Sequence, residues 1–415
     1  MKKKQLENPF TPGFGCYPCV VMGRDSVIDE FENALDHDKP GCQDTFPLFS
    51  GNRGVGKTVL LDKVESILRQ RGFFIYRCNA MNGMAEQFKQ KLLGGKAIKK
   101  RTKKELNPSV EVVNGESAYK FAGFSFSSER EIEEFDLELS DVILMKLNER
   151  NCHGVAIIID EVGRQYIEEL RRIALTVQKI AGAGNRVVMS AAGVSENIDD
   201  IEDDETISFT RRMHRLHIDA IDIDEAKNGI RRTLEINSME IDDEVLDRMA
   251  EATDGYPFII QRIAYDTWNQ AYSRRDPEHI HIIGDDFMNA TPIFVSRIYE
   301  SIVRPTIRNL SPTDRAFLEA MSADGGEPSR MSDIAGRMGR ALNYANTYRT
   351  RLVRRDVIAS IGHGLVVSKI PYLMMYMGNI EAAERLCGLY SPAINTRSKS
   401  REIATENLLN LGYDI

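Results

Sequence analysis

One eight-residue segment constrains this chain more than any other. It begins at Gly51 and fits the complete pattern G-x-x-x-x-G-K-[ST]. In such a segment the glycines let backbone N–H groups point inward around phosphate oxygens, at the positive end of the following helix. The lysine reaches the β- and γ-phosphates, and the last hydroxyl coordinates Mg²⁺. The sequence therefore predicts a P-loop that binds ATP with Mg²⁺, made of Gly51, Asn52, Arg53, Gly54, Val55, Gly56, Lys57 and Thr58.

The surroundings of this segment favour the same interpretation. A short apolar run, 46–50, ends directly in the glycine-rich loop. Residues 59–68 have helical spacing, and 73–76 form a second apolar run. Strand, loop, helix and strand make a βαβ unit, which is the setting that a P-loop requires.

Two carboxylates follow the most apolar run of the chain. Val155 to Ile159 are five apolar residues in a row, typical of a strand buried on both faces of a parallel sheet. Asp160 is placed to hold the hydration shell of Mg²⁺, and Glu161 would orient and deprotonate the attacking water. The alternative is a pair of solvated carboxylates after a core strand.

Three further residues are candidates for the same site. Ser190 is expected to end the next buried strand, where it would touch the γ-phosphate or the attacking water, or else cap the strand. Arg211 and Arg212 precede a last strand near 215–218. They would serve as an arginine finger acting on a neighbouring copy, or they are ordinary surface arginines.

The alternation of elements predicts the fold class. Residues 40–220 alternate strand and helix, which indicates a P-loop α/β fold with a parallel sheet. We expect a core over 1–221 with an N-terminal arm, a β-hairpin insertion near 95–130 and an acidic helix over 131–150. A helical lid over 222–300 would hold helices at 224–236, 242–253 and 257–273. A winged helix-turn-helix would cover 301–378, with a tail over 379–415.

Composition limits the functional classes. The net charge of −8 over 415 residues excludes a molecule that is basic all round, so a nucleic-acid site must be local. No run approaches the roughly 18 apolar residues of a membrane span, and no apolar region follows the charged N-terminus. We expect a cytoplasmic protein with reduced thiols and no membrane contact. Cys16 and Cys19, with His37 and Cys42, could supply four zinc ligands, or they are ordinary loop residues.

The C-terminal region carries a local reversal of charge. Residues 330–355 hold seven arginines against one acid, Asp333. A helix over 343–355 would be a recognition helix on double-stranded DNA, with contacts from Arg340, Asn343, Asn346, Thr347, Arg349 and Arg351. Alternatively, the basic face holds an acidic surface of the same chain, at 129–141 or 199–205.

These motifs together resemble the AAA+ ATPases of the origin-recognition-complex type and the related STAND NTPases. Residues 22–25 look like the G-R-[ED] box that these families place against adenine, and 255–257 look like the STAND lid motif. The likeness spans most of 8–376, and segments 9–15 and 255–261 also resemble a set of bacterial ATP-binding proteins. It implies adenine contacts from Gly23, Arg24, Tyr256 and Pro257. Where initiators carry a lid arginine, Arg262 is the available substitute.

Two functions are compatible with these motifs. The first is a slow ATP-hydrolysing AAA+ switch that engages double-stranded DNA through its winged helix and self-associates with ATP. The second is a STAND-like signalling or defence ATPase whose winged helix mediates autoinhibition or protein contacts. A small-molecule kinase would use the same P-loop, but this chain devotes its C-terminal third to a winged helix.

Overall fold

The structure is a computed structural model of the whole chain. It describes residues 6–13, 16–37, 42–94, 99–100, 133–134, 137–203, 210–274, 279–378 and 406–409. The expected insertion near 95–130 and the expected tail over 379–415 fall outside these residues, apart from 99–100 and 406–409.

A five-stranded sheet forms the core of the N-terminal half. Its strands are β1 (Pro47–Ser50), β2 (Phe73–Asn79), β5 (Gly154–Asp160), β6 (Val187–Gly193) and β7 (His214–His217). They lie in the order β2-β5-β6-β1-β7, and every neighbouring pair is parallel. β5 and β6 are buried along their whole length, as strands covered on both faces must be. The predicted parallel α/β sheet is therefore confirmed.

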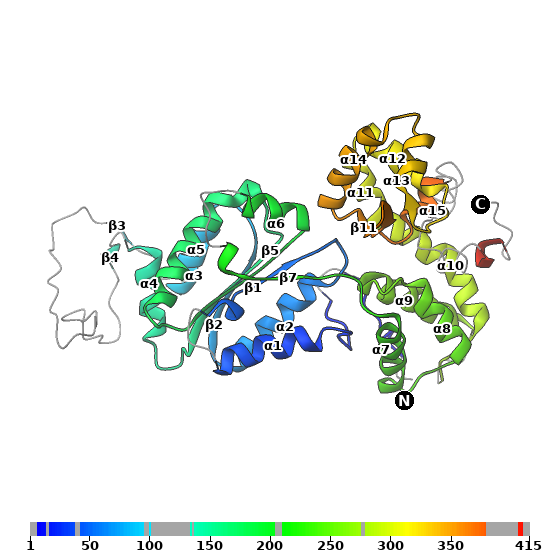
Figure 1. Cartoon of the computed structure of the whole chain (residues 1–415). Helices are drawn as coiled ribbons and strands as arrows, with labels where there is room; N and C mark the ends of the chain where they lie inside the picture. The colour runs from blue at the N-terminus through cyan, green and yellow to red at the C-terminus, as the bar shows by residue number, and fades with distance from the viewer. Residues whose placement is uncertain are drawn as a thin grey trace.

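Helices cover both faces of this sheet. Alternate residues of each strand enter two separate apolar clusters, because side chains in a strand point to opposite faces. One face packs on α1 (Asp25–His37) and α2 (Lys57–Gln70). The other packs on α3 (Met84–Leu92), α4 (Leu139–Leu147) and α5 (Ile167–Gly182). Figure 1 shows the two groups on either side of the strands.

A helical lid follows the sheet. It consists of α7 (Ile223–Ile236), α8 (Asp243–Ala252), α9 (Pro257–Ser273) and α10 (Gly284–Ile298). The first three helices match the sequence prediction within a residue or two, and α10 was missed. The lid also holds a short parallel pair, β8 (Glu240–Ile241) with β9 (His281–Ile282), where only helices were expected. Pairs of two residues are too short to leave a periodic signal.

The C-terminal unit contains the elements of a winged helix. A π-helical turn (Tyr299–Val303) and α11 (Arg304–Arg308) lead to α12 (Pro312–Ser322), α13 (Met331–Arg337) and α14 (Leu342–Arg354). Strands β10 (Ser329–Arg330), β11 (Ile358–Gly362) and β12 (Leu365–Ser368) form an antiparallel sheet, and α15 (Leu373–Gly378) closes the unit. Ser311 and Asp314 form a capping box that begins α12. The three helices and the hairpin match the prediction, while β10 was not expected.

The expected acidic helix over 131–150 is shorter in the structure. Residues Glu133–Glu134 form strand β4, which pairs with β3 (Lys99–Lys100). The helix begins at Leu139 because Glu138 and Asp141 form a capping box there. It ends at Leu147.

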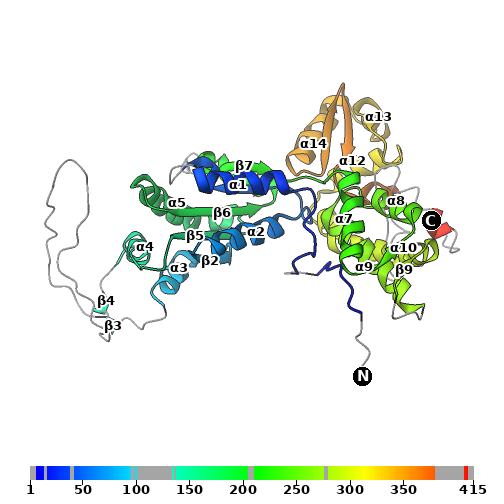
Figure 2. The ribbon, with the colours of Figure 1, turned by 90° about the horizontal axis from the view of Figure 1, so that it is seen from below.

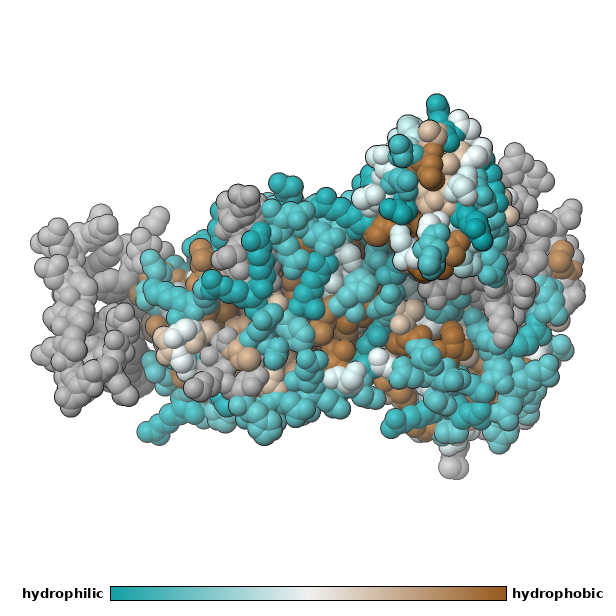
Figure 3. All heavy atoms as spheres, viewed as in Figure 1, coloured by the Kyte–Doolittle hydropathy of each residue, from teal (hydrophilic) through white to brown (hydrophobic). Residues whose placement is uncertain are grey.

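The three units pack together. One apolar cluster extends from Phe49 in the sheet through Ile260 in the lid to Leu352 in the winged-helix unit. Figure 2 shows the lid and the winged-helix unit side by side at one end of the sheet. Hydrophilic residues cover most of the face seen in Figure 3, with smaller hydrophobic spots among them. Among the described residues, no helix is both long enough and apolar enough to cross a membrane.

Candidate nucleotide site

The glycine-rich segment connects β1 to α2, as the sequence predicts. Gly51 has φ 149°, and a Cβ there would lie 2.1 Å from the carbonyl oxygen of Ile218. Gly56 has φ 94° and immediately precedes α2. Only glycine suits both positions, since the first has no room for a side chain and the second has a left-handed backbone. The loop therefore places the N-terminus of α2 at the carboxyl end of the sheet.

Thr58 and Asp160 meet at the start of α2. The Thr58 hydroxyl donates a hydrogen bond of 2.8 Å to Oδ2 of Asp160, which is only 7% exposed. The other oxygen of Asp160 accepts the backbone N–H of Glu161 at 2.9 Å. A hydroxyl and a buried carboxylate side by side are oxygen ligands of the kind that Mg²⁺ prefers. The residues present therefore fit the cation that the P-loop implies.

Lys57 folds back onto its own loop. Its ammonium donates to the carbonyl oxygens of Gly51, at 2.9 Å, and Asn52. Burial lowers the pKa of Lys57 to about 8, against the attraction of Asp160 and with help from the nearby Arg53. The group is thus mostly charged at neutral pH, although it has been removed from water.

Glu161 stands just beyond strand β5 with an exposed side chain. Its φ of 55° is left-handed, which costs a non-glycine residue about 1–2 kcal/mol. The turn is held on the far side by a 2.9 Å hydrogen bond from Val162 N–H to the carbonyl of Ala192. Neighbouring contacts therefore fix Glu161 next to the carboxylate of Asp160.

The residues expected around adenine gather at the P-loop. The Arg24 guanidinium donates to the carbonyl oxygens of Val55, at 3.3 Å, and Asp219. Burial lowers its pKa. The neighbouring Gly23 packs on the first turn of the lid.

The lid itself approaches the loop from the other side. Phe258 N–H donates to the carbonyl of Gly54 at 3.1 Å, and Pro257 lies against Gly56. Tyr256, before Pro257, is 1% exposed. The N-terminal arm runs along the same helix, α9, where Thr11 N–H donates to Gln261 at 2.9 Å.

Ser190 does not reach this site, so its assignment as a phosphate or water contact was wrong. It lies in the middle of β6, opposite Ile158, and is fully buried. Its hydroxyl donates to the carbonyl of Pro47 at 3.3 Å. The strand continues through Ala191, Ala192 and Gly193, small residues that the sequence did not mark as part of a strand.

The structure separates the candidate arginines. Arg211 and Arg212 are exposed in a short 3₁₀ turn, where Arg211 donates to the carbonyl of Glu202 at 3.1 Å. They remain accessible to a neighbouring copy. Arg262, the substitute lid arginine, is instead held within the lid by Asp266 at 2.8 Å.

A polar cluster between the P-loop and the winged-helix unit was missed by sequence reasoning. Asp356 follows α14 and is 8% exposed. Its backbone carbonyl accepts the side-chain amide of Asn52 at 2.7 Å. Its carboxylate accepts Ser195 Oγ at 3.1 Å and Lys369 Nζ at 2.7 Å, and Lys369 also pairs with Asp219 at 2.9 Å. We call these five residues, Asn52, Ser195, Asp219, Asp356 and Lys369, the docking cluster.

Within the docking cluster, Lys369 and Asp219 each favour the charged form of the other. Burial opposes the charged form of Asp219, yet its hydrogen bond to Lys369 leaves the pKa of this carboxyl below the usual value. The two carboxylates likewise raise the pKa of Lys369 against the effect of its burial. No sequence motif marks these residues, since Asp356 is a single acid beside consecutive arginines.

The predicted DNA contacts divide into two groups. Arg340, Asn343 and Thr347 are exposed, and Asn346 and Arg349 are half-buried. Arg351 is used internally: its guanidinium binds Asp314 at 2.9 Å and Ser311 at 2.8 Å. This contact neutralises a fully buried carboxylate of α12. The Arg351 side chain is nevertheless 43% exposed, so its assignment as a phosphate contact stays a prediction.

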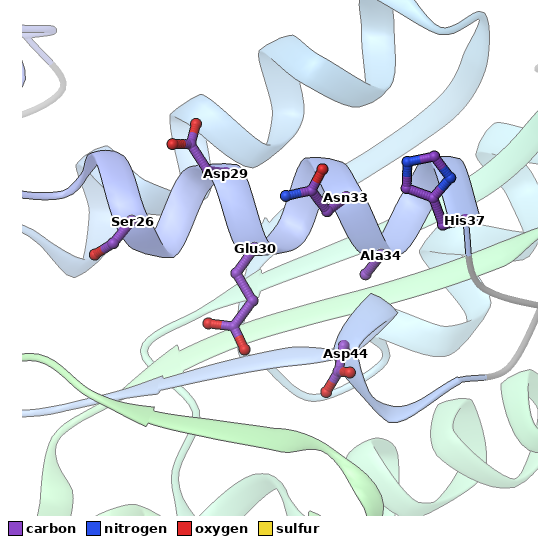
Figure 4. A pocket seen from close by; sticks show the side chains of 7 residues that line it. All are labelled: Ser26, Asp29, Glu30, Asn33, Ala34, His37 and Asp44. Atoms are coloured by element: carbon purple, nitrogen blue, oxygen red, sulfur yellow. The ribbon is translucent and has the colours of Figure 1, made fainter.

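A second group of side chains that could hold a metal ion, Glu30, Asp44 and His214, lies at the other end of the sheet. His214 Nδ1 is 3.3 Å from Asp44 and 3.6 Å from Glu30. Figure 4 shows the adjoining shallow pocket along α1. Since His214 pairs with Pro47 at the start of β1, this group is remote from the P-loop. In the part of the chain that the structure describes, Cys16, Cys19, His37 and Cys42 do not converge on a common metal position.

Comparisons with known proteins agree with this architecture. Residues 300–377 match a family described as "Domain of unknown function (DUF8462)". No curated protein matches the sequence. The solved structure of the Aeropyrum pernix ORC2 protein (ADPNP–ADP complexes) has a TM-score of 0.56 at 13% identity, covering 96% of this chain and 98% of that chain.

Two other similar structures have lower scores. The Aeropyrum pernix ORC1 protein in complex with DNA has a TM-score of 0.42 at 14% identity, covering 95% of this chain and 94% of that chain. The Thermotoga maritima RuvB Holliday junction branch migration motor has a TM-score of 0.41 at 17% identity, covering 84% and 93%. The similarity to the ORC2 structure and the strand order of the sheet show that the chain has the fold of AAA+ ATPases.

Proposed function

We propose that this chain is an ATP-binding, slowly hydrolysing AAA+ switch in which the nucleotide state controls a winged helix that binds double-stranded DNA. The observation that carries the proposal is the hydrogen bond from Asn52, inside the P-loop, to the carbonyl of Asp356, at the end of α14. The P-loop is thereby joined to the turn that directly follows the proposed recognition helix, α14.

The site residues have separate roles in this proposal. Lys57 and the P-loop amides bind the phosphates, and Thr58 and Asp160 would hold Mg²⁺, which supplies charge neutralisation between the phosphates. Glu161 orients and deprotonates the attacking water. Gly23, Arg24, Tyr256 and Pro257 enclose the base. The ADPNP and ADP complexes of the similar ORC2 protein support nucleotide binding at this fold.

Binding of phosphate in the P-loop would change the contacts of the docking cluster. In the structure the Lys57 ammonium donates hydrogen bonds to the carbonyl oxygens of Gly51 and Asn52. Phosphate oxygens compete for this ammonium, because charged hydrogen bonds are stronger than bonds to carbonyls. The backbone of Asn52 would then rearrange, and its side chain would lose the hydrogen bond to the carbonyl of Asp356. Loss of this hydrogen bond would weaken the attachment of the winged helix to the core.

The DNA-binding part of the proposal rests on the exposed face of α14. Asn343, Thr347 and the half-buried Asn346 and Arg349 lie there beside two exposed or half-exposed tyrosines, and the exposed Arg340 lies just before the helix. Side chains of these types bind phosphates and base edges. We further propose ATP-dependent self-association, with Arg211 or Arg212 entering the site of a neighbouring copy. The units would divide at 1–221, 222–300, 301–378 and 379–415.

Nucleotide chemistry is tested with two variants. Lys57→Ala is expected to reduce ATP binding at least a hundredfold, since the phosphates lose their charged partner. Glu161→Gln is expected to bind ATP as the parent does and to hydrolyse it at least a hundredfold more slowly. Calorimetry and phosphate release measure the two effects. Parental hydrolysis by Glu161→Gln would remove this residue from the mechanism.

DNA binding is tested with a fluorescent duplex, with and without a non-hydrolysable ATP analogue. Arg340→Ala combined with Arg349→Ala is expected to weaken binding about tenfold and to reduce its salt dependence by about 1.8 in slope. ATP analogue should strengthen binding by the parent. A control pair, Arg69→Ala with Arg231→Ala, removes the same charge from α2 and the lid.

A second candidate is a STAND-like signalling or defence ATPase whose winged helix holds the resting state. It is favoured by the ion pairs that Arg354 and Arg355 make with the core. ATPase activity without duplex binding at low salt, in every nucleotide state, would select this candidate over the first.

A further inference from the structure

One helix of the ATPase core faces the basic end of α14. This helix, α6 (Ser195–Glu202), and the residue after it are covered by arginines of the winged-helix unit. Arg354 lies 2.8 Å from both Asp200 and Asp203, and Arg355 lies 3.0 Å from Glu196. Figure 1 shows α6 beside the winged-helix unit. The contacts therefore join two units that are far apart in sequence, as 154 residues separate Arg354 from Asp200.

The charge of α6 is entirely of one sign. Residues 195–205 contain seven acids and no lysine or arginine, the acids being Glu196, Asp199, Asp200, Glu202, Asp203, Asp204 and Glu205. Asp199 and Glu202 hold Arg215 of β7, so the acids toward the winged helix are the ones paired with Arg354 and Arg355. An arginine fork binds a carboxylate and a phosphate with the same geometry.

We propose that α6 is an intramolecular competitor of duplex DNA. Its carboxylates occupy Arg354 and Arg355 while the winged helix is docked, and the same two arginines bind backbone phosphates once it is released. The competitor acts on the DNA site of the proposed function and depends on that function. It makes docking and DNA binding mutually exclusive at the basic end of α14, while Arg340 and Arg349 stay accessible in both states.

The strength of these pairs suits a reversible competitor. The side chains of Arg354 and Asp203 are 48% and 72% exposed. Each ion pair at such exposure shifts the equilibrium between the docked and the released winged helix by about fivefold at most. Phosphates can therefore displace the carboxylates, and the docked state needs the docking cluster and the apolar contacts as well.

Charge neutralisation on the core tests this proposal, because α6 itself contacts no DNA in it. Asp200→Asn with Asp203→Asn is expected to tighten binding of a fluorescent duplex about 3- to 20-fold at fixed salt. Freeing Arg354 adds one phosphate contact, so the slope of log affinity against log salt should steepen by about 0.9. Adding Glu196→Gln removes the ion pair of Arg355, which keeps its bond to the carbonyl of Asn309 in its own unit, and should steepen the salt slope by about 0.9 again.

A matched control removes the same charge elsewhere. Glu149, just after α4, and Glu168, in α5, are exposed acids that each pair with a basic residue of their own region, Lys146 and Arg171. Figure 1 shows α4 and α5 away from the winged-helix unit. Glu149→Gln with Glu168→Gln is expected to leave the salt slope unchanged. Adding Arg354→Ala to the Asp200→Asn/Asp203→Asn variant should abolish the added slope.

The outcomes separate the competitor from the function beneath it. If the parent binds duplex but the α6 variant keeps the affinity and slope of the control, α6 is no competitor and DNA binding stands. A gain that survives Arg354→Ala also overturns the competition. If neither the parent nor the triple α6 variant binds duplex at about 50 mM salt, DNA binding itself fails.

Discussion

At the residue scale, Lys57 links the electrostatics of the site to pH. Its pKa in the folded, nucleotide-free protein is about 8, lowered chiefly by burial from the ordinary lysine value of 10.5. Between these two values the unfolded chain binds more protons than the folded one. The contribution of Lys57 to the free energy of unfolding of the nucleotide-free protein should therefore rise with pH across this window.

Nucleotide affinity should show the opposite trend. ATP phosphates bind the charged ammonium, so affinity is expected to fall above pH 8, approaching about tenfold per pH unit. Titration calorimetry between about pH 7 and 9.5 measures this. Lys57→Arg supplies the control, because a guanidinium keeps its charge over the whole range. A parental affinity that stays constant across that range would contradict the assignment of Lys57 to the phosphates.

At the scale of elements, the contact between α12 and α14 depends on Arg351. Arg351→Ala leaves Asp314, which is fully buried, with only its capping contacts to Ser311. We expect a loss of about 1–3 kcal/mol in the free energy of unfolding, measured by urea denaturation. Arg349→Ala, on the same helix, should cost under about 0.5 kcal/mol. Equal stability of the two variants, with weaker DNA binding by Arg351→Ala, would instead support Arg351 as a phosphate contact.

The sequence predicted elements well where a strong local signal existed. The P-loop and the apolar run before Asp160 fixed β1, α2 and β5, because glycine geometry and burial on both faces leave few alternatives. Ser190 was misplaced because Ala191–Gly193 are small and carry no strand signal, although the sheet extends through them. Strand β10 was missed because two residues are too few for a period.

At the scale of the whole molecule, the attachment of the winged helix could not be predicted from the sequence. Asn52 and Asp356 are 304 residues apart, and neither the bond between them nor the burial of Asp356 follows from its neighbours in the chain. The sequence did identify residues 199–205 as an acidic surface that the basic helix could hold, and the structure places Arg354 on two of those acids. Charge patterning can therefore suggest which segments could form ion pairs, but only the structure shows which of these pairs form.

We expect the P-loop and the winged helix to be coupled through Asn52. Asn52→Ala removes the 2.7 Å bond to Asp356 but keeps the backbone that binds phosphate. A buried hydrogen bond of this kind is worth about 1 kcal/mol, which corresponds to about fivefold in the docking equilibrium. The amides of α6 should thus exchange hydrogen about fivefold faster without nucleotide, and ATP analogue should accelerate them less than in the parent. Arg53→Ala alters the neighbouring, exposed position of the same loop and should leave exchange unchanged. If Asn52→Ala exchanges as Arg53→Ala does, the remaining ion pairs and apolar contacts hold the winged helix without Asn52, and nucleotide must reach it through the lid.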